Sequence, residues 1–315
     1  MIAYIIRRLF SMIPTFLLAS VLVFMSMHLI PGDPASVMLG DMATVDQIQK
    51  LREEMGLNKP VYVQFGIWFA GVLKGNLGRS IFFEKPVLQV IAARAETSIF
   101  IATISMMIIV LVGITVGIIS AIRYNSTIDQ VASGLSMFGA SIPTFWLGLN
   151  LMLLFAVVLR WLPSSGFPSV LASGDVSNLR YLILPSITLA APNSALIIRL
   201  TRSAMLDVMR EDYVMTARSK GLGETSVNLK HVFRNALISV VAALGFTFVG
   251  LASGTVVTET VFALPGIGRL VVESVLRRDY PVIQGVVLVI VTIYMIFNLL
   301  VDLSYAYLDP RIRYS

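Results

Sequence analysis

The sequence predicts an all-α membrane protein with six transmembrane helices. Hydrophobic residues make up 57% of the chain and charged residues only 13%, against roughly 25% charged residues in a soluble domain. The mean hydropathy is +0.84, and uncharged stretches as long as the ~20 residues of a spanning helix recur along the chain. We expect these stretches to be helical because backbone groups in lipid must be hydrogen-bonded within their own segment.

The first predicted span lies between Arg8 and Asp33 and contains no charged residue. It is too long for the apolar region of a signal peptide. It ends in Ile-Pro-Gly-Asp-Pro, which is not a small-residue cleavage site. We therefore expect the chain to retain it as a transmembrane helix.

Residues 31–95 form a long polar segment without a spanning run. Within it, Thr44 and Gln47 form a capping-box pattern for a helix that ends at Gly56. A second helix is predicted to start at Pro60. One side of this helix is apolar and carries Val61, Phe65, Trp68, Phe69 and Val72. We expect this side either to lie at the membrane surface or to pack on the helix bundle.

Two of the remaining predicted spans contain prolines in their interior. Pro143 predicts a bend within the third span. The fourth span is short and contains Pro185 and Pro192, so we expect a broken helix that forms a wall of a translocation pathway. Glu259 stands at the end of the fifth span, where interfacial water would solvate it. The second to sixth predicted spans cover residues 99–122, 131–159, 181–198, 235–258 and 281–301.

The connection between the fourth and fifth spans, residues 201–235, is long, polar and basic. Asp212 is the predicted N-cap of a short helix, and Gly221 is the predicted left-handed residue that ends it. A second short helix starts near Thr225, and the two helices form a compact knob that faces water. One face of the second helix is apolar and carries Leu229, Val232, Phe233, Ala236 and Leu237.

Basic residues predict which side of the membrane this connection faces. Six spans place both termini on one side. Most Lys and Arg side chains of the short connections then lie on that same side, including those from Arg199 to Arg234. Because cytoplasmic loops carry the excess of Lys and Arg, both termini and the connection are predicted to be cytosolic.

The connection also carries a motif. It reads Asp-Tyr-Val-Met-Thr-Ala-Arg-Ser-Lys-Gly at 212–221 and His-Val-Phe-Arg-Asn-Ala at 231–236. This resembles the "EAA loop" of permease subunits of binding-protein-dependent ABC importers. Only Ala217, Gly221 and, loosely, Phe233 match the general pattern of that loop. The departures are those of the peptide/nickel branch of the family.

Other stretches extend the resemblance over nearly the whole chain. Gly-Asn-Leu-Gly-Arg-Ser at 75–80, Leu-Pro-Gly-Ile-Gly-Arg-Leu at 264–270, Arg-Asp-Tyr-Pro-Val-Ile-Gln at 278–284 and the Asp-Pro-Arg-Ile-Arg-Tyr ending resemble dipeptide and oligopeptide permeases. The resemblance implies a type I ABC importer permease fold in the bacterial inner membrane. It also implies a coupling helix that docks on an ATPase subunit through Asp212, Tyr213, Thr216, Ala217, Arg218, Lys220, Gly221, Gly223 and Glu224.

The same resemblance implies the partners, the cargo and the domains. The partners are a homologous second permease, two ABC ATPase subunits that hold ATP and Mg, an extracytoplasmic substrate-binding protein and the lipid bilayer. The cargo is a di- or oligopeptide, with glutathione, nickel or a metal chelate as alternatives. Residues 1–95 form the first transmembrane helix and a long extracytoplasmic segment, 96–306 a five-helix permease core, and 307–315 a cytoplasmic tail.

The sequence also limits other classes of function. It contains no Gly-Lys dipeptide, so the phosphate-binding loop of an ATPase is absent. His-Glu-x-x-His and Gly-x-Ser-x-Gly are absent as well, which disfavours a membrane enzyme. With no cysteine, the chain has no thiolate metal site, and no run of like charges predicts nucleic-acid binding. A secondary transporter or channel is the alternative, although the spans hold few ionisable groups.

Pathway residues are predicted only from polar or helix-breaking character within the spans. The candidates are Asn150, Pro192, Asn193 and Asn298. Hydrogen bonding between helices is the alternative role for the asparagines, because buried polar groups need partners.

Overall fold

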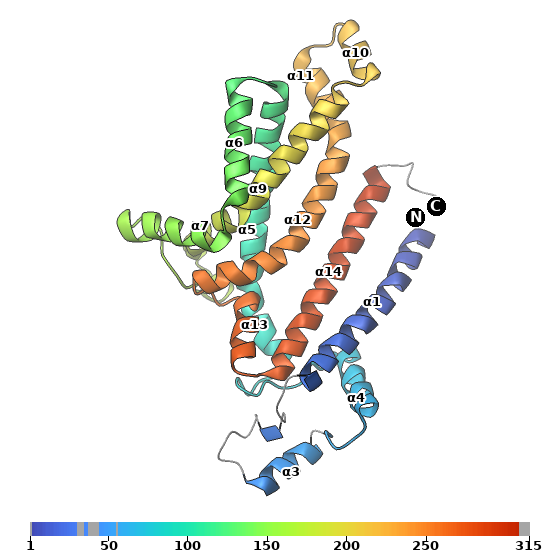
Figure 1. Ribbon diagram of the computed structural model, residues 1–315, viewed down its shortest axis with the longest axis vertical. Coiled ribbons are helices and arrows are strands. Elements are labelled where there is room, and N and C mark those ends of the chain that lie inside the picture. Colours follow the sequence, from blue (N-terminus) through green and yellow to red (C-terminus); the bar gives the residue numbers. More distant parts are fainter. Residues whose placement is uncertain (1, 30–34, 37–43, 55, 309–315) are drawn as a thin grey trace. The chain divides into compact units, whose positions relative to one another are not determined.

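The structure, a computed structural model, describes residues 2–29, 35–36, 44–54 and 56–308 (Figure 1). These residues are almost entirely helical, which confirms the predicted all-α fold for the described part of the chain. The helices divide into two compact units. The core unit comprises Glu96–Arg269 and the stretch that begins at Phe297, and the N-terminal unit comprises Ile2–Ala95 and Leu270–Ile296.

Among the described residues, five helices are long and apolar enough to cross a membrane. A sixth candidate is a pair of helices with a sharp bend between them. The six predicted spans are therefore recovered when this bent pair counts as one. The five continuous candidates are Arg7–His28, Val87–Ile122, Val176–Val208, Glu224–Leu251 and Tyr280–Val301.

Aromatic packing organises the N-terminal unit. The ring of Phe24 on α1 (Ile2–Leu29) lies 5.4 Å from that of Phe65 and 5.5 Å from that of Trp68, both on α4 (Val61–Leu73). The aromatic side of α4 therefore packs on another helix, which is one of the two placements predicted from the sequence. Such ring pairs add ~0.5–1.5 kcal/mol each beyond the area they bury.

The predicted capping box is also confirmed. It precedes α3 (Val45–Glu54). The Gln47 backbone N–H donates to Thr44 Oγ1 at 3.3 Å, and the Thr44 N–H donates to Gln47 Oε1 at 2.9 Å. Two backbone N–H donors at the start of α3 are thereby satisfied.

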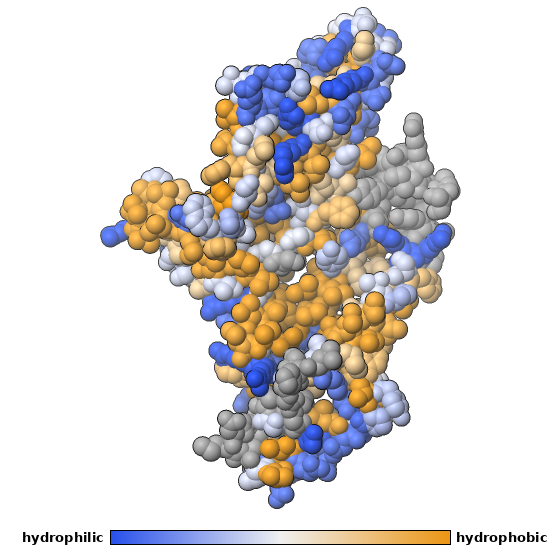
Figure 2. All heavy atoms as spheres, viewed as in Figure 1, coloured by the Kyte–Doolittle hydropathy of each residue, from blue (hydrophilic) through white to orange (hydrophobic). Residues whose placement is uncertain are grey.

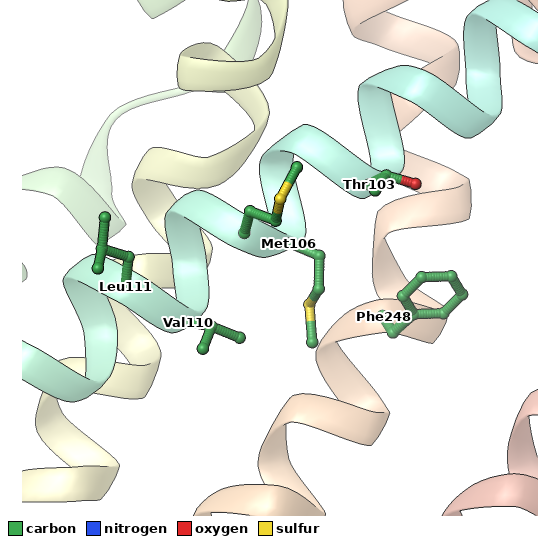
Figure 3. A pocket seen from close by; sticks show the side chains of 6 residues that line it. Thr103, Met106, Val110, Leu111 and Phe248 are labelled. Atoms are coloured by element: carbon green, nitrogen blue, oxygen red, sulfur yellow. The ribbon is translucent and has the colours of Figure 1, made fainter.

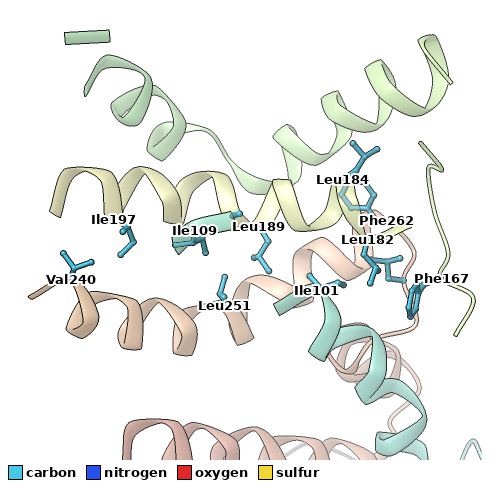
Figure 4. Close-up of a cluster of buried hydrophobic side chains, with 12 residues drawn as sticks. Ile101, Ile109, Phe167, Leu182, Leu184, Leu189, Ile197, Val240, Leu251 and Phe262 are labelled. Atoms are coloured by element: carbon cyan, nitrogen blue, oxygen red, sulfur yellow. The ribbon is translucent and has the colours of Figure 1, made fainter. Parts of the chain in front are cut away.

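The core unit is built around α9 (Arg180–Val208), which packs against α6 (Thr127–Ser141), α7 (Thr144–Leu151) and α12 (Arg234–Val261). Its Leu182, Leu189 and Ile197 are almost completely buried. Figure 4 shows these side chains directed into one apolar layer with residues of α5 and α12. The helices that supply or flank this layer are α5 (Val87–Ile122), α6 (Thr127–Ser141), α7 (Thr144–Leu151) and α12 (Arg234–Val261).

The third predicted span is broken rather than merely bent. Helix α6 ends at Ser141, and α7 continues into the π-helix η1 (Met152–Val158) at an angle of 103° to α6. Pro143 explains the break, because it lacks a backbone N–H and forces the residue before it out of the helical region. Ile142 is accordingly extended, with φ −78° and ψ 127°.

The fourth predicted span is, in contrast, unbroken, so this prediction was wrong. Helix α9 runs through both Pro185 and Pro192 and includes Arg199 and Arg202, which were expected beyond its end. In the apolar, membrane-spanning part of this helix 61% of the residues are buried, which is more than in any other continuous span described. Packing on three neighbouring helices stabilises α9 enough to offset the two hydrogen bonds that its prolines cannot make.

The last two helices are α13 (Ile267–Leu276) and α14 (Tyr280–Leu308). Figure 2 shows hydrophilic side chains gathered over the end of the core unit that carries α10 (Asp212–Ser219) and α11 (Glu224–Ser226), with hydrophobic side chains along the helices next to it. This end of the core unit therefore suits water, and the adjoining helices suit lipid or another apolar partner.

Candidate functional site

The α9–α12 connection projects from the end of the core unit as a helix–turn–helix (Figure 1). Helix α10 starts at Asp212, but its N-cap is Glu211, whose backbone is extended with φ −72° and ψ 142°. The predicted cap at Asp212 was therefore wrong by one residue. Asp212 lies instead in the first turn, where its negative charge complements the partial positive charge of the helix N-terminus.

Gly221 ends α10 as predicted. Its φ is +77°, and the N–H of the following Leu222 donates back to the Ala217 carbonyl at 3.4 Å. A Cβ added at Gly221 would meet no atom within 4 Å. The left-handed backbone, and not a lack of space, therefore explains a glycine at this position.

The second helix of the connection differs from the prediction. Helix α11 runs directly into the π-helix η3 (Val227–Phe233) and then into α12 without a break, so it is not a separate short helix. Leu229, predicted on the buried face, is 47% exposed, whereas Val227 and Val232 are completely buried. A π-turn has more residues than an α-turn, so Val227 and Val232, five residues apart, lie on the same buried side.

Helix α10 rests on a second apolar cluster, which we call the seat. Val214 and Ala217 of α10 are 0% and 7% exposed and pack with Met205 near the end of α9 and Ala121 at the end of α5. The side of η3 and α12 that faces them completes the seat with Val227, Val232 and Ala236. Helix α10 is thus fixed to the ends of three long helices. A larger or charged side chain at Ala217 would disrupt this packing.

The outer side of the connection combines apolar and charged groups. Met215 and Leu222 are 60% and 42% exposed. Arg218 Nε donates to Glu224 Oε1 at 3.0 Å, and Lys220 and Gly223 are exposed beside this pair. A surface of this kind can bind a protein groove that is apolar at its base and polar at its rim.

Two polar side chains of α10 form hydrogen bonds with other parts of the connection. The Thr216 hydroxyl donates to the Asp212 carbonyl at 3.0 Å, and Asn235 Nδ2 donates to Tyr213 Oη at 3.0 Å. Partial burial raises the pKa of Tyr213 above its ordinary value, while the bond from Asn235 acts in the opposite direction. Tyr213 is therefore neutral at physiological pH and links α10 to the start of α12.

The four predicted pathway residues lie on three helices. Asn150 Nδ2 on α7 donates to the Trp146 carbonyl at 2.7 Å, and Asn193 Nδ2 on α9 donates to the Leu189 carbonyl at 2.9 Å. Both amides thus bond within their own helix, four residues back, which leaves their oxygens available. Pro192 and Asn298 are half-buried on α9 and α14.

A pocket of about 520 Å³ opens between α5 and α12 of the core unit (Figure 3). Its lining is almost entirely apolar, with one hydroxyl from Thr103; the other lining residues are Met106, Met107, Val110, Leu111 and Phe248. The described residues bring no three His, Asp or Glu side chains together around a possible metal ion.

Glu259 was expected to be solvated, and this expectation was wrong. It is completely buried at the end of α12. Its carboxylate accepts from Ser98 Oγ at 2.6 Å and from the Arg269 backbone N–H, in the first turn of α13, at 2.8 Å. A Cβ at Gly266 would lie 2.1 Å from Glu259 Cδ. The Leu-Pro-Gly-Ile-Gly loop therefore needs a glycine at 266 to fold over this carboxylate.

In the N-terminal unit, two of the stretches that carried the resemblance meet. Asp279 is 1% exposed and accepts hydrogen bonds from Ser80 Oγ and from the backbone N–H groups of Ile81 and Phe82, both at 3.2 Å. Residues 199 positions apart in sequence are thereby joined. Sequence reasoning had no signal for this pairing, because both stretches read as ordinary turns.

The core fold, the projecting α10 and the sequence agree on one class of protein. Residues 113–314 match the family of binding-protein-dependent transport system inner membrane components. Residues 1–106 match the family that describes the N-terminal region of these membrane components. The chain belongs to this family, whose members are permease subunits of ABC transporters located in the bacterial inner membrane.

Individual relatives cover the whole chain. A protein of Sinorhizobium fredii described as a probable peptide ABC transporter permease is 42% identical over 311 residues, 99% of both chains. A glutathione transport system permease of Pectobacterium atrosepticum is 44% identical over 315 residues, 100% of both chains.

Solved structures support the fold. A chain of the MetNI methionine ABC transporter, in an inward-facing conformation, aligns with a TM-score of 0.59 at 15% identity, covering 70% of this chain and 97% of that one. A chain of an amino acid ABC transporter aligns with a TM-score of 0.51 at 16% identity, covering 70% and 94%. The type I ABC importer permease fold predicted from the sequence is thereby confirmed.

Proposed function

We propose that this chain forms half of the translocation pathway of an ATP-driven peptide importer and that α10 is the helix through which ATPase subunits drive it. The observation that carries the proposal is the two-sided character of α10. Its inner side is fixed to α5, α9 and α12 through the seat, and its outer side exposes Met215, with Leu222 exposed in the turn that follows it. A displacement of α10 by a partner would therefore move three long helices together.

In this mechanism the connection 201–235 and both termini are cytosolic. ATP binding closes a dimer of ATPase subunits, and the groove that holds residues 212–224 moves with them. The attached helices then rock and expose the pathway first to one side of the membrane and then to the other. ATP and Mg stay on the ATPase subunits, and this chain supplies the mechanical connection.

Exposed residues of the connection would make the contacts with the ATPase. Met215 supplies apolar area, and Arg218, Lys220 and Glu224 supply charge at the rim. The rim charges each contribute under about 1 kcal/mol because water and salt screen them. Gly221 shapes the turn through its positive φ, whereas Gly223 has an ordinary φ of −63°. Most of the docking free energy then comes from the apolar contact and from the rigid presentation of α10.

The complete importer would contain a second, homologous permease, two ATPase subunits and an extracytoplasmic binding protein. Residues 96–306 would form the permease core, and 1–95 would contribute the first transmembrane helix and an extracytoplasmic segment. Asn150, Pro192, Asn193 and Asn298 are the proposed pathway residues. The amide oxygens of Asn150 and Asn193 suit the N–H groups of a peptide backbone.

The proposed cargo is a di- or oligopeptide. Support comes from full-length relatives described as peptide and glutathione permeases at 42% and 44% identity. Glutathione is itself a tripeptide, so one pathway chemistry serves both. Nickel or a metal chelate is the alternative cargo, and the apolar pocket between α5 and α12 offers no His, Asp or Glu side chain as a ligand for it.

The experiment reconstitutes the permease pair, the ATPase subunits and the binding protein in proteoliposomes. Dipeptides, oligopeptides, reduced glutathione and chelated nickel are then compared for stimulation of ATP hydrolysis. Because the chain has no cysteine, Met215→Cys gives a unique site for cross-linking to the ATPase. We expect Met215→Cys to cross-link and the exposed Met137→Cys on α6 to remain unlinked. Equal cross-linking at both positions, or at neither, would contradict the docking role of α10.

A further inference from the structure

A buried ion pair lies next to the seat, at the ends of α5, α6 and α9. Asp129 accepts from Arg202 Nε at 2.6 Å and from Arg202 Nη2 at 2.8 Å, so the pair is bidentate. The side chain of Asp129 is 3% exposed and that of Arg202 is 26% exposed. A two-point bond between a carboxylate and a guanidinium fixes orientation as well as distance.

The same carboxylate joins two more parts of the chain. It accepts from Ser120 Oγ near the end of α5 and from the Asn125 backbone N–H in the α5–α6 turn, the latter at 3.0 Å. The guanidinium of Arg202 in turn lies 5.3 Å from the ring centre of Tyr124. One buried carboxylate on α6 therefore connects the end of α5, the α5–α6 turn and α9.

Close helix packing surrounds this ion pair. A Cβ at Gly117 of α5 would lie 2.6 Å from Thr201 Cβ of α9, and a Cβ at Gly113 would lie 2.6 Å from Ile197 Cγ2. The two glycines are four residues apart, as are their two contacts on α9. Small residues at this spacing let two helix backbones approach closely. Helices α5 and α9 are thus in direct contact immediately beside Arg202.

Arg202 stands between this contact and the seat. The residue before it, Thr201, packs on Gly117, and Met205, three residues after it, belongs to the seat beneath Val214 of α10. A continuous series of contacts therefore leads from α10 through α9 and the ion pair to α6. Helix α6 has no described residue in the seat, so near the seat the ion pair is its direct polar link to α9.

From this arrangement we infer that the Asp129–Arg202 pair is a positioning device that makes α6 move with the coupling helix during the ATP cycle. The inference rests on the proposed coupling role of α10. Without the pair, displacement of α10 would still move α5, α9 and α12, but α6 and α7 would follow only through their packing on α9, without a fixed orientation. Asp129 and Arg202 touch neither ATP nor cargo and act through the helices that they join.

The test measures a distance within the chain. Spin labels are attached to cysteines placed at Lys230 of η3 and Met137 of α6, both exposed and both outside residues 212–224. The distance is measured in the assembled transporter without nucleotide and with ATP bound. In the native chain we expect one narrow distance that is the same in both states, because α6 follows the connection. A change between the two states in the native chain would overturn the inference.

The variants are Asp129→Asn and Arg202→Lys, which remove the charge and the two-point geometry respectively. We expect the distance in each to broaden or to shift on ATP binding, and substrate-stimulated ATP hydrolysis to fall by about fivefold or more. The double variant should lose no more than either single variant, because the two side chains act as a unit. Arg199→Gln, an exposed arginine on the same helix, is the matched control and should behave as native.

The outcomes separate the two proposals. If Met215→Cys does not cross-link to the ATPase, the proposed coupling role of α10 is refuted, independently of the results for the ion pair. Intact cross-linking together with a native distance and native stimulation in Asp129→Asn would refute the inference alone. If Asp129→Asn fails to assemble, the native chain and Arg202→Lys still decide it.

Discussion

Gly221→Val tests whether the geometry of the connection matters for coupling. At φ +77° a residue with a Cβ is strained, and the cost is about 1–2 kcal/mol. No atom lies within 4 Å of the added Cβ, so the Cβ itself causes no steric overlap in the isolated chain. The strain falls on α10, an eight-residue helix, rather than on the membrane helices. A cost of this size reduces the native conformation of the turn by a factor of roughly 5–30 relative to its alternatives.

The matched control is Gly223→Val. Gly223 lies two residues further along, has φ −63°, and also has no atom within 4 Å of an added Cβ. The two variants therefore add the same side chain to the same exposed turn and differ in backbone strain. Gly221→Asn is a second control, because asparagine tolerates the left-handed region better than other residues with a Cβ.

The assay is stimulation of ATP hydrolysis in the reconstituted importer by binding protein loaded with peptide. The melting temperature of the assembled complex is measured alongside it. We expect Gly221→Val to lose most of the stimulation with an unchanged melting temperature, and Gly223→Val and Gly221→Asn to keep most of it. Equal stimulation in Gly221→Val and Gly223→Val would refute the argument that the left-handed turn presents α10 to the ATPase.

Three further predictions concern contacts elsewhere in the chain. Gly266→Ala would force a Cβ against the buried Glu259 and should lower stability by about 1–3 kcal/mol in thermal melting, whereas Gly250→Ala, with open space around it, should not. Asp279→Ala would leave three backbone N–H groups without their carboxylate acceptor and should cost about 1–3 kcal/mol by the same measurement; full stability would show that water replaces the carboxylate. Arg218→Gln removes an exposed ion pair and should change stability by under about 1 kcal/mol, with no salt dependence left at this pair.

The sequence predicted those features that depend on local chemistry. Apolar length alone located the long helices, because lipid requires internally bonded backbone. The capping box at Thr44 and Gln47 and the left-handed Gly221 were also correct, since each depends on a few neighbouring residues. The motif at 212–221 indicated the family before any contact was known.

Predictions failed where neighbouring helices decide the outcome. Prolines led to the expectation of a broken fourth span, yet α9 remains continuous because three helices pack around it. Pro143, which is exposed, does break its helix. Leu229 was misplaced because a π-turn altered the periodicity, and π-turns have no reliable signal in local sequence.

The sequence by itself determined the membrane class, the positions of the long helices and the turn that shapes α10, because each follows from residues close together in the chain. Only the tertiary structure decided that Glu259 is buried, that Asp279 meets Ser80, and that Asp129 pairs with Arg202. A charged group next to a turn looks solvated in a sequence. Whether it is buried depends on a partner that can be 73 or 199 residues away, and the free energy of such a bond is gained only once the helices have packed.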